Sequence, residues 1–353
     1  MNNEQRLIIA LLGRDGEADF QNLITQDLDW KYFIQTCLLH RVIQLILLKK
    51  DLANYIPPEI LDKIKAKSQN VALENLNLSM NLIQISQLLK ANGIEFLTYK
   101  GPTLSVLAFG NESLRQSGDL DLLIFKKDMA KIRKIIAENG GKDSWKLTPK
   151  QEKAVFRLYN EFPMLFGESE TLIEFHWAFA ESFLAFDYGF EEVFRNSQKV
   201  LLHGLEISAL SDEDQLIVLT FHGSKHFWTQ LNWICDIAGL LERRPIDWDK
   251  TIKKAAQLGT LRMLWLGLFL AKDLFHAVLP ADILRQIQKD TQIQPLSGAI
   301  KKHLFDENFS GEEIKTKIYL QMRERWRDKL TYSHRLLTTK MFDSMFMPMG
   351  RPR

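Results

Sequence analysis

Two aspartates, Asp119 and Asp121, are the residues of this sequence whose spacing most directly suggests chemistry. They begin a mostly apolar run that ends at Phe125, and this run predicts a β-strand. Side chains two residues apart in a strand lie on the same face, so both carboxylates point the same way. Such a pair on an apolar strand is unfavourable unless a cation lies between the two charges. Magnesium is bound by carboxylates together with phosphate oxygens, and we therefore predict a metal site here.

The segment before these aspartates has the features of a phosphate-binding turn. Glu95 to Tyr99 predicts a strand, and Lys100-Gly101-Pro102 leads into a helix predicted from Thr103 to Phe109. Glycine permits close backbone approach, and the first turn of a helix presents free N–H groups with partial positive charge. We therefore expect Lys100 and Gly101 to bind phosphate, with Arg115 and Ser117 in the loop that follows.

A third carboxylate is expected from a strand predicted over Thr171 to Trp177, where apolar and polar residues alternate. Glu174 and His176 share one face of this strand. We expect an antiparallel neighbouring strand to place Glu174 beside the two aspartates. His176 is predicted either to orient substrate or phosphate or to cap the sheet edge, and the pattern favours neither role over the other.

These residues together resemble the pattern of uncharacterised bacterial nucleotidyltransferases in the polymerase-β-like nucleotidyltransferase superfamily. The residues that carry the resemblance are Lys100, Gly101, Arg115, Ser117, Asp119, Asp121, the run Glu174 to Trp177, and the later segment Phe221 to Leu241. The resemblance covers residues 75 to 240 best. The sequence departs from many relatives in having Lys-Gly-Pro where they have Gly-Ser or Gly-Gly.

The resemblance implies transfer of a nucleoside monophosphate from a nucleoside triphosphate to an acceptor hydroxyl or phosphate, with release of pyrophosphate. It implies that Asp119, Asp121 and Glu174 bind two magnesium ions, with manganese as an alternative, and that Glu174 can accept the acceptor's proton. Arg115 or Ser117 would stabilise the departing charge. The acceptor stays open among sugars, antibiotics, peptides, proteins and tRNA, with nucleic acid least favoured.

Residues after 180 predict mostly helices. Ser211 followed by Asp214 indicates the start of a helix that runs to about His226. His222 and His226 are four residues apart, but no H-E-x-x-H glutamate or nearby third ligand accompanies them, which argues against zinc. The functional alternative is that His222, Lys225 or His226 reaches the substrate phosphates, and we count Lys225 among the nucleotide-binding candidates.

Two other polar features are more simply explained by packing. His40 and Arg41 interrupt an apolar helical pattern, and we interpret them as a partly exposed polar pair rather than as pocket residues. Trp228 and Trp233 are expected to pack a domain interface, with Asp236 paired to a nearby cation.

The order of elements predicts an α+β protein in which a small mixed sheet of polymerase-β-like nucleotidyltransferase type is flanked by helices. We predict an N-terminal helical region at 1–92, a nucleotidyltransferase core at 93–180 and a C-terminal helical domain at 181–353. Further strands are expected at Phe156 to Tyr159 and Phe162 to Phe166, with a hairpin at Lys199 to Ile207.

Composition limits the classes of partner. The chain has 353 residues, 46% hydrophobic and 25% charged, with a net charge of +2, so bulk charge requires neither nucleic acid nor a membrane. Its two cysteines, Cys37 and Cys235, form no C-x-x-C motif, and no signal peptide is visible, so we expect a cytoplasmic enzyme. The competing hypotheses are a catalytically silent nucleotide-binding or protein-interaction module, and a toxin-like transferase acting on RNA or protein.

Overall fold

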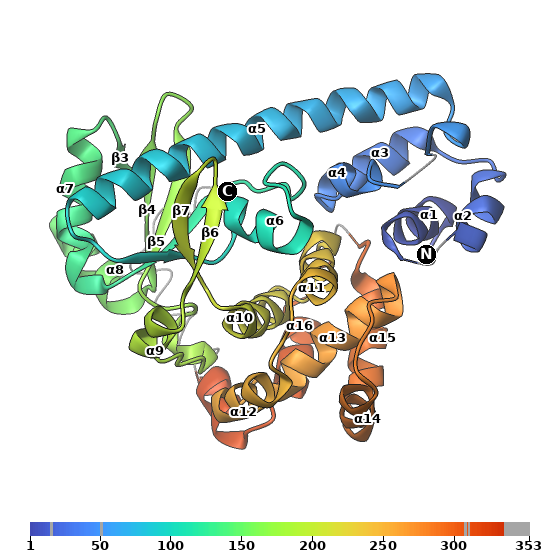
Figure 1. Ribbon diagram of the computed structural model, residues 1–353. Coiled ribbons are helices and arrows are strands. Elements are labelled where there is room, and N and C mark those ends of the chain that lie inside the picture. The colour runs from blue at the N-terminus through green and yellow to red at the C-terminus, as the bar shows by residue number, and fades with distance from the viewer. Residues whose placement is uncertain (15–16, 50–51, 307–308, 310, 335–353) are drawn as a thin grey trace.

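The computed structural model describes residues 1–14, 17–49, 52–306, 309 and 311–334, so the end of the predicted C-terminal domain, 335–353, lies outside the described residues. Helices surround one seven-stranded sheet (Figure 1). The helices before the sheet are α1 (Asn3–Leu12), α2 (Glu17–Ile24), α3 (Trp30–Leu39), α4 (Ile43–Ile46) and α5 (Pro58–Ala91). The strands are β1 (Phe96–Thr98), β2 (Leu120–Ile124), β3 (Lys142–Asp143), β4 (Glu161–Phe166), β5 (Thr171–His176), β6 (Gln198–Leu202) and β7 (Leu205–Ala209).

Besides α1 to α5, one group of helices lies between strands in the chain and a second group follows the last strand. The first group comprises α6 (Gly101–Phe109), α7 (Met129–Glu138), α8 (Pro149–Leu158) and α9 (Phe190–Arg195). The second comprises α10 (Asp212–Lys225), α11 (Leu231–Arg243), α12 (Trp248–Leu258), α13 (Leu261–Phe275), α14 (Ala281–Lys289), α15 (Ile293–His303) and α16 (Glu312–Met322). Among the described residues, no helix has the length and apolar character needed to span a membrane.

Helix α5 connects the N-terminal helices to the sheet (Figure 1). It has 34 residues and begins at Pro58, where a missing N–H group costs the helix nothing. Its second half buries Leu82, Ile85 and Leu89 in a core shared with the sheet and α7. This face of the sheet is therefore covered, and the chemistry predicted for Asp119 and Asp121 must lie on the other face.

The sheet has the strand order β3-β4-β5-β2-β1-β7-β6 and is mixed. Strand β2, which carries Asp121, pairs antiparallel with β1 and parallel with β5, and Asp121 lies opposite Glu174. The expectation that an antiparallel neighbour carries Glu174 was wrong. Strands β4 and β5 form an antiparallel hairpin, so β5 returns in the direction of β2. Side-chain alternation predicts the face of a residue but not the direction of its neighbour strand.

The predicted α+β class with a mixed sheet is confirmed, with two differences of detail. The hairpin β6–β7 joins the sheet through a parallel pairing of Thr98 with Ala209, so the sheet continues past residue 180. The strand expected at Phe156 to Tyr159 is instead the end of α8, because Thr148 and Gln151 form a capping box that starts a helix. Phe156 then stacks on Phe162 and Trp177, which explains its apolar character.

Candidate active site

A polar cavity of about 280 Å³ lies between the open face of the sheet and the C-terminal helices, and it collects most of the predicted site residues. Lys100, Arg115, Ser117, Asp119, Glu174, His176 and Lys225 all line it. We call the side formed by Tyr99, Lys100, Asp119, Glu161, Glu174 and His176 the sheet wall, and the side formed by Arg41, Phe221, His222, Lys225, His226 and Trp233 the helical wall. Gly101 is a predicted residue that does not line the cavity.

Asp121 lies beneath the sheet wall and is 2% exposed. Its Oδ1 accepts hydrogen bonds from Tyr99 Oη at 3.1 Å and Lys100 Nζ at 3.3 Å, and lies 3.1 Å from His176 Nε2. Burial alone would raise the pKa of Asp121, but Lys100 and His176 outweigh it and lower the pKa below its ordinary value. Asp121 is therefore an ionised carboxylate.

Asp119 precedes strand β2 and is partly buried. Burial and the charge of Asp121 raise the pKa of Asp119 to about 6, while Lys100 and Arg41 oppose the increase. The pKa values of two carboxylates two residues apart are thus shifted in opposite directions. The arrangement stores negative charge that an added cation would stabilise.

Glu174 and His176 lie together on strand β5, with Glu161 opposite His176 on β4. His176 Nε2 is 3.4 Å from Glu174 Oε2, and His176 Nδ1 is 3.3 Å from Glu161 Oε2. Burial alone would lower the pKa of His176, but its carboxylate neighbours raise the pKa to about 10. The ring is therefore a cation, and each of its two nitrogens can donate a hydrogen bond. His176 lines the cavity, as the first of its two predicted roles, orienting substrate or phosphate, would require. Its ring contacts the acidic groups there.

The turn before α6 has the predicted form. Lys100 is the N-cap residue, and Gly101 has a φ of +66°, a left-handed conformation that favours glycine. Pro102 lies in the first turn, and Lys100 Nζ forms an ion pair with Asp121. The glycine serves the backbone path of this turn, while the lysine places a cation at the carboxylates.

Arg115 and Ser117 line the cavity but are already bonded within the fold. Arg115 Nε donates to both carboxylate oxygens of Asp236, at 2.8 and 3.0 Å, and its Nη1 donates to Ser117 Oγ at 2.8 Å. Burial alone would lower the pKa of Arg115, but the carboxylate of Asp236 more than offsets this effect and raises the pKa of Arg115 above its ordinary value. The expected cation for Asp236 is therefore Arg115.

The helical wall carries the aromatic and imidazole side chains predicted from the C-terminal region. The His222 and His226 rings are 4.6 Å apart, and the Trp233 ring lies 5.2 Å and 5.5 Å from them, measured between centroids. Lys225 Nζ forms an ion pair with Glu181 at 3.0 Å. These residues line the cavity from the C-terminal helices.

The interpretation of His40 and Arg41 as a partly exposed packing pair was wrong. His40 is 1% exposed, and its Nδ1 accepts a hydrogen bond from the N–H of Leu231 at 3.3 Å. Arg41 lines the cavity. Sequence reasoning missed Tyr99 and Glu161 altogether. A polar residue at the start of an otherwise apolar strand was the available signal for Glu161.

The residues beneath and on the sheet wall fit a divalent metal ion. Asp121 Oδ2 is buried and lacks a hydrogen-bond partner among the described residues. Ligand atoms of Asp121 and Glu174 lie within 4.8 Å of each other, close enough to share one ion, while the protonated His176 ring beside them supplies no ligand atom. A buried carboxylate oxygen without a partner, beside further carboxylates, is a donor set that a hard cation satisfies.

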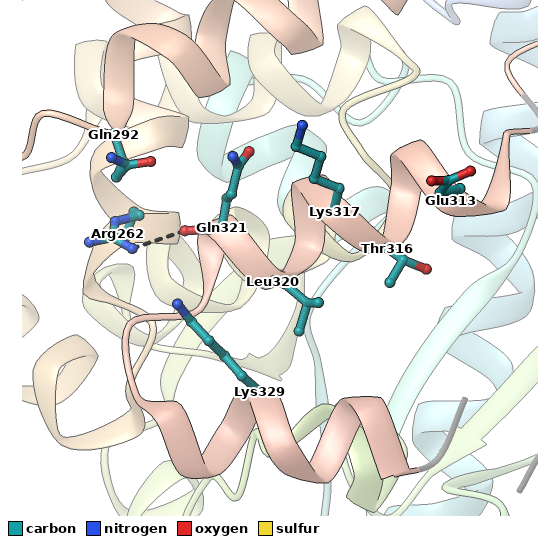
Figure 2. A pocket seen from close by; sticks show the side chains of 8 residues that line it. All are labelled: Arg262, Gln292, Glu313, Thr316, Lys317, Leu320, Gln321 and Lys329. Carbon is teal, nitrogen blue, oxygen red and sulfur yellow. Dashed lines mark hydrogen bonds between the residues drawn. The ribbon is translucent and has the colours of Figure 1, made fainter. Parts of the chain in front are cut away.

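A larger surface depression, of about 530 Å³, lies among the C-terminal helices (Figure 2). Arg262 lies at one end of it and is bonded to Asp290 and to the carbonyl of Gln321. Glu313 is the carboxylate among its lining residues. Its described lining residues include no second carboxylate and no unpaired buried acceptor, so this depression lacks the features that distinguish the cavity at Asp121.

Comparisons with known proteins place these features in context. Residues 26–276 match the model of a family described as uncharacterised nucleotidyltransferase. Among solved structures, the solution structure of the antibiotic-resistance factor ANT(2'')-Ia matches with a TM-score of 0.32 and 14% identity, covering 65% of this chain and 97% of that one. That likeness is too distant to support an argument. No curated protein matches the sequence.

Proposed function

Because this chain belongs to the uncharacterised nucleotidyltransferase family, we propose that it transfers a nucleoside monophosphate from a nucleoside triphosphate to an acceptor hydroxyl or phosphate. An acceptor oxygen forms a bond to the α-phosphorus. The bond from that phosphorus to the oxygen bridging the β-phosphate breaks, and its electron pair leaves with pyrophosphate.

The observation that carries this proposal is the unpaired Oδ2 of Asp121 within a group of three carboxylates. A carboxylate kept ionised and buried, with one oxygen left without a donor, is costly unless a cationic ligand binds there. Asp119 and Glu174 are the neighbours that would share such a ligand. This combination is what a metal-dependent phosphoryl transfer site requires.

Asp119, Asp121 and Glu174 would bind magnesium, or manganese in its place. When bound, the metal neutralises phosphate charge and activates the attacking oxygen. The side chains of Tyr99 and Lys100 orient Asp121 through its Oδ1. Glu174, which is partly exposed to the cavity, is the base that accepts the proton of the acceptor hydroxyl.

Lys100, which lines the cavity, would bind the β- and γ-phosphates together with the Gly101 backbone beside it. Arg115 and Ser117 would contribute positive charge and a hydroxyl at the edge of the cavity, in the geometry that Asp236 enforces. Preorganised donors of this kind stabilise charge that develops during transfer without reorganising.

We propose a small molecule, peptide or protein as the acceptor rather than a nucleic acid, because a net charge of +2 supplies little general attraction for a polyanion. We also propose that the protein acts in a reducing cytoplasm, since Cys37 and Cys235 are free and buried.

Titration calorimetry with ATP, GTP, CTP and UTP, with and without magnesium, tests the proposal on the wild type and on the double variant Asp119→Asn, Asp121→Asn. We expect one nucleotide to bind only with magnesium and only to the wild type. Binding that is unchanged in the double variant would refute the metal assignment. Magnesium-dependent pyrophosphate release then separates an enzyme from a silent nucleotide-binding module.

A further inference from the structure

We infer that Arg41, on the turn between α3 and α4, binds the triphosphate of the donor nucleotide from the helical wall. The inference rests on the proposed function and adds a residue that lies far in sequence from the carboxylate motif.

Four lysine or arginine side chains line the cavity, and three of them are bound to carboxylates of the fold. Lys100 pairs with Asp121, Arg115 with Asp236, and Lys225 with Glu181. For Arg41 the described residues supply no hydrogen bond or ion pair to the guanidinium. An arginine with five donors and no committed partner is the cation of this cavity best able to bind an added anion in bidentate fashion.

The position of the guanidinium is consistent with a phosphate ligand. A Cβ atom built on Gly118 would lie 3.8 Å from both terminal nitrogens of Arg41, so the guanidinium rests against the backbone that leads into Asp119. The positive charge of Arg41 also acts on the Asp119 carboxylate. A phosphate chain bound at the carboxylates would therefore lie within the field of Arg41.

The backbone at Arg41 has a conformation that glycine normally supplies. Arg41 has a φ of +56°, and it follows His40, the C-cap of α3. Its N–H donates to the Leu38 carbonyl and that of Val42 to the Cys37 carbonyl, the pattern of a Schellman motif, whose left-handed residue is usually glycine. An arginine there costs backbone energy, and such strain is common where a side chain serves a ligand.

Helix α11 holds this turn in place. The N-cap of α11, Gln230, makes no side-chain cap bond. Instead, the N–H of Leu231 donates to His40 Nδ1 and the N–H of Asn232 donates to the His40 carbonyl, both at 3.3 Å. His40 thus satisfies two free N–H groups of α11 and fixes the residue that follows it. The direction of Arg41 into the cavity is set by this contact between distant segments.

The test compares wild type with Arg41→Gly, Arg41→Gln and the control Arg285→Gln, which changes an exposed arginine on α14. Magnesium complexes of the four nucleoside triphosphates, and of pyrophosphate, are titrated by calorimetry. Loss of one charged phosphate contact should weaken binding of the triphosphate and of pyrophosphate by about 10- to 100-fold in both Arg41 variants. Arg285→Gln should bind as the wild type does.

The glycine variant separates a binding role from a folding role. Glycine relieves the left-handed strain, so Arg41→Gly should not lower the Tm while it weakens phosphate binding. Wild-type affinity in both Arg41 variants would overturn the assignment of Arg41 and leave the proposed function intact. A wild type that binds neither the triphosphates nor pyrophosphate would overturn both.

Discussion

Beneath the sheet wall, Asp121 uses one carboxylate oxygen to accept from Tyr99 and Lys100 and keeps the other without a partner. Behind the helical wall, Asp236 on α11 uses both oxygens, and both accept from Arg115. The two aspartates are similarly buried, at 2% and 0% exposure. The comparison teaches that burial and a cationic neighbour do not distinguish the candidate metal-binding carboxylate from the ion-paired one. Within this pair the difference is an oxygen without a described partner, and at Asp121 that oxygen lies beside further carboxylates.

The same contrast extends to the groups around each aspartate. On the sheet wall, Glu161, Glu174 and Asp121 surround His176, an excess of acidic groups over cations that a ligand can correct. On the helical side, Arg115 and His40 each have partners that join one segment of the chain to another. Substitutions of Asp121 and of Asp236 should therefore affect different properties, mainly activity for the first and mainly stability for the second.

The largest expected effect is on the sheet side. Asp121→Asn keeps the shape of the side chain but removes the charge needed for phosphoryl transfer, and we expect turnover to fall by at least about 10,000-fold, or about 5 kcal/mol. The fold should persist, because Lys100 is partly solvated and His176 can lose its proton. Pyrophosphate release and the Tm are measured beside Asp143→Asn, which changes a carboxylate on β3. Full activity in Asp121→Asn would show that the Asp121 carboxylate is not needed for transfer and does not differ from Asp236 in this respect.

The next effect should appear in stability. Asp236→Asn leaves the Arg115 guanidinium buried without a countercharge, and we expect the free energy of unfolding to fall by about 3 to 5 kcal/mol. Urea denaturation measures it. The double variant Arg115→Met, Asp236→Leu should recover much of the loss, since apolar residues often replace a buried ion pair without penalty. If the free energy of unfolding of Asp236→Asn instead equals that of the wild type, the ion pair between Arg115 and Asp236 does not stabilise the fold.

A smaller effect concerns how the free energy of unfolding depends on pH through His40, the residue that precedes Arg41. Burial lowers the pKa of His40 from 6.5 to about 4, so its neutral form stabilises the fold above pH 6.5 and this contribution is lost as the pH falls toward 4. Between pH 7 and pH 5 the loss is about 2 kcal/mol. His40→Asn should show a flatter dependence of unfolding free energy on pH. Parallel profiles for wild type and variant would show that His40 does not titrate in this way.

The smallest effect tests an outer member of the sheet wall. Glu161→Gln removes a charge that faces His176 Nδ1, and as a positioning change it should reduce kcat by about 10-fold, or about 1.4 kcal/mol, with little change in KM. Glu170→Gln, at an exposed turn position that pairs with Lys142, is the matched control and should be neutral. Equal activity of both variants would limit the functional carboxylates to the predicted three.

Local pattern was sufficient for much of the sheet wall. Alternation along Leu120–Ile124 and Thr171–His176 predicted which side chains share a face, although Asp121, Leu123 and His176 are buried as well. Lys100-Gly101-Pro102 predicted a helix whose start, at Gly101, lies two residues before the expected Thr103. The sequence also contained the signal for family membership, because the motif is contiguous within about 30 residues. Periodicity and turn chemistry are short-range properties, so a single chain segment is enough to predict them.

Tertiary structure alone decided the rest. The parallel pairing of β2 with β5 and the addition of β6 and β7 to the sheet depend on which strands meet. Arg115 finds Asp236 across 121 residues of sequence, and His40 finds Leu231 across 191. Arg41, which lines the cavity, directly follows the residue that makes this second contact. Contacts between distant segments leave no local periodicity, so the sequence by itself determined the candidate carboxylates, and packing decided which cations and helices surround them.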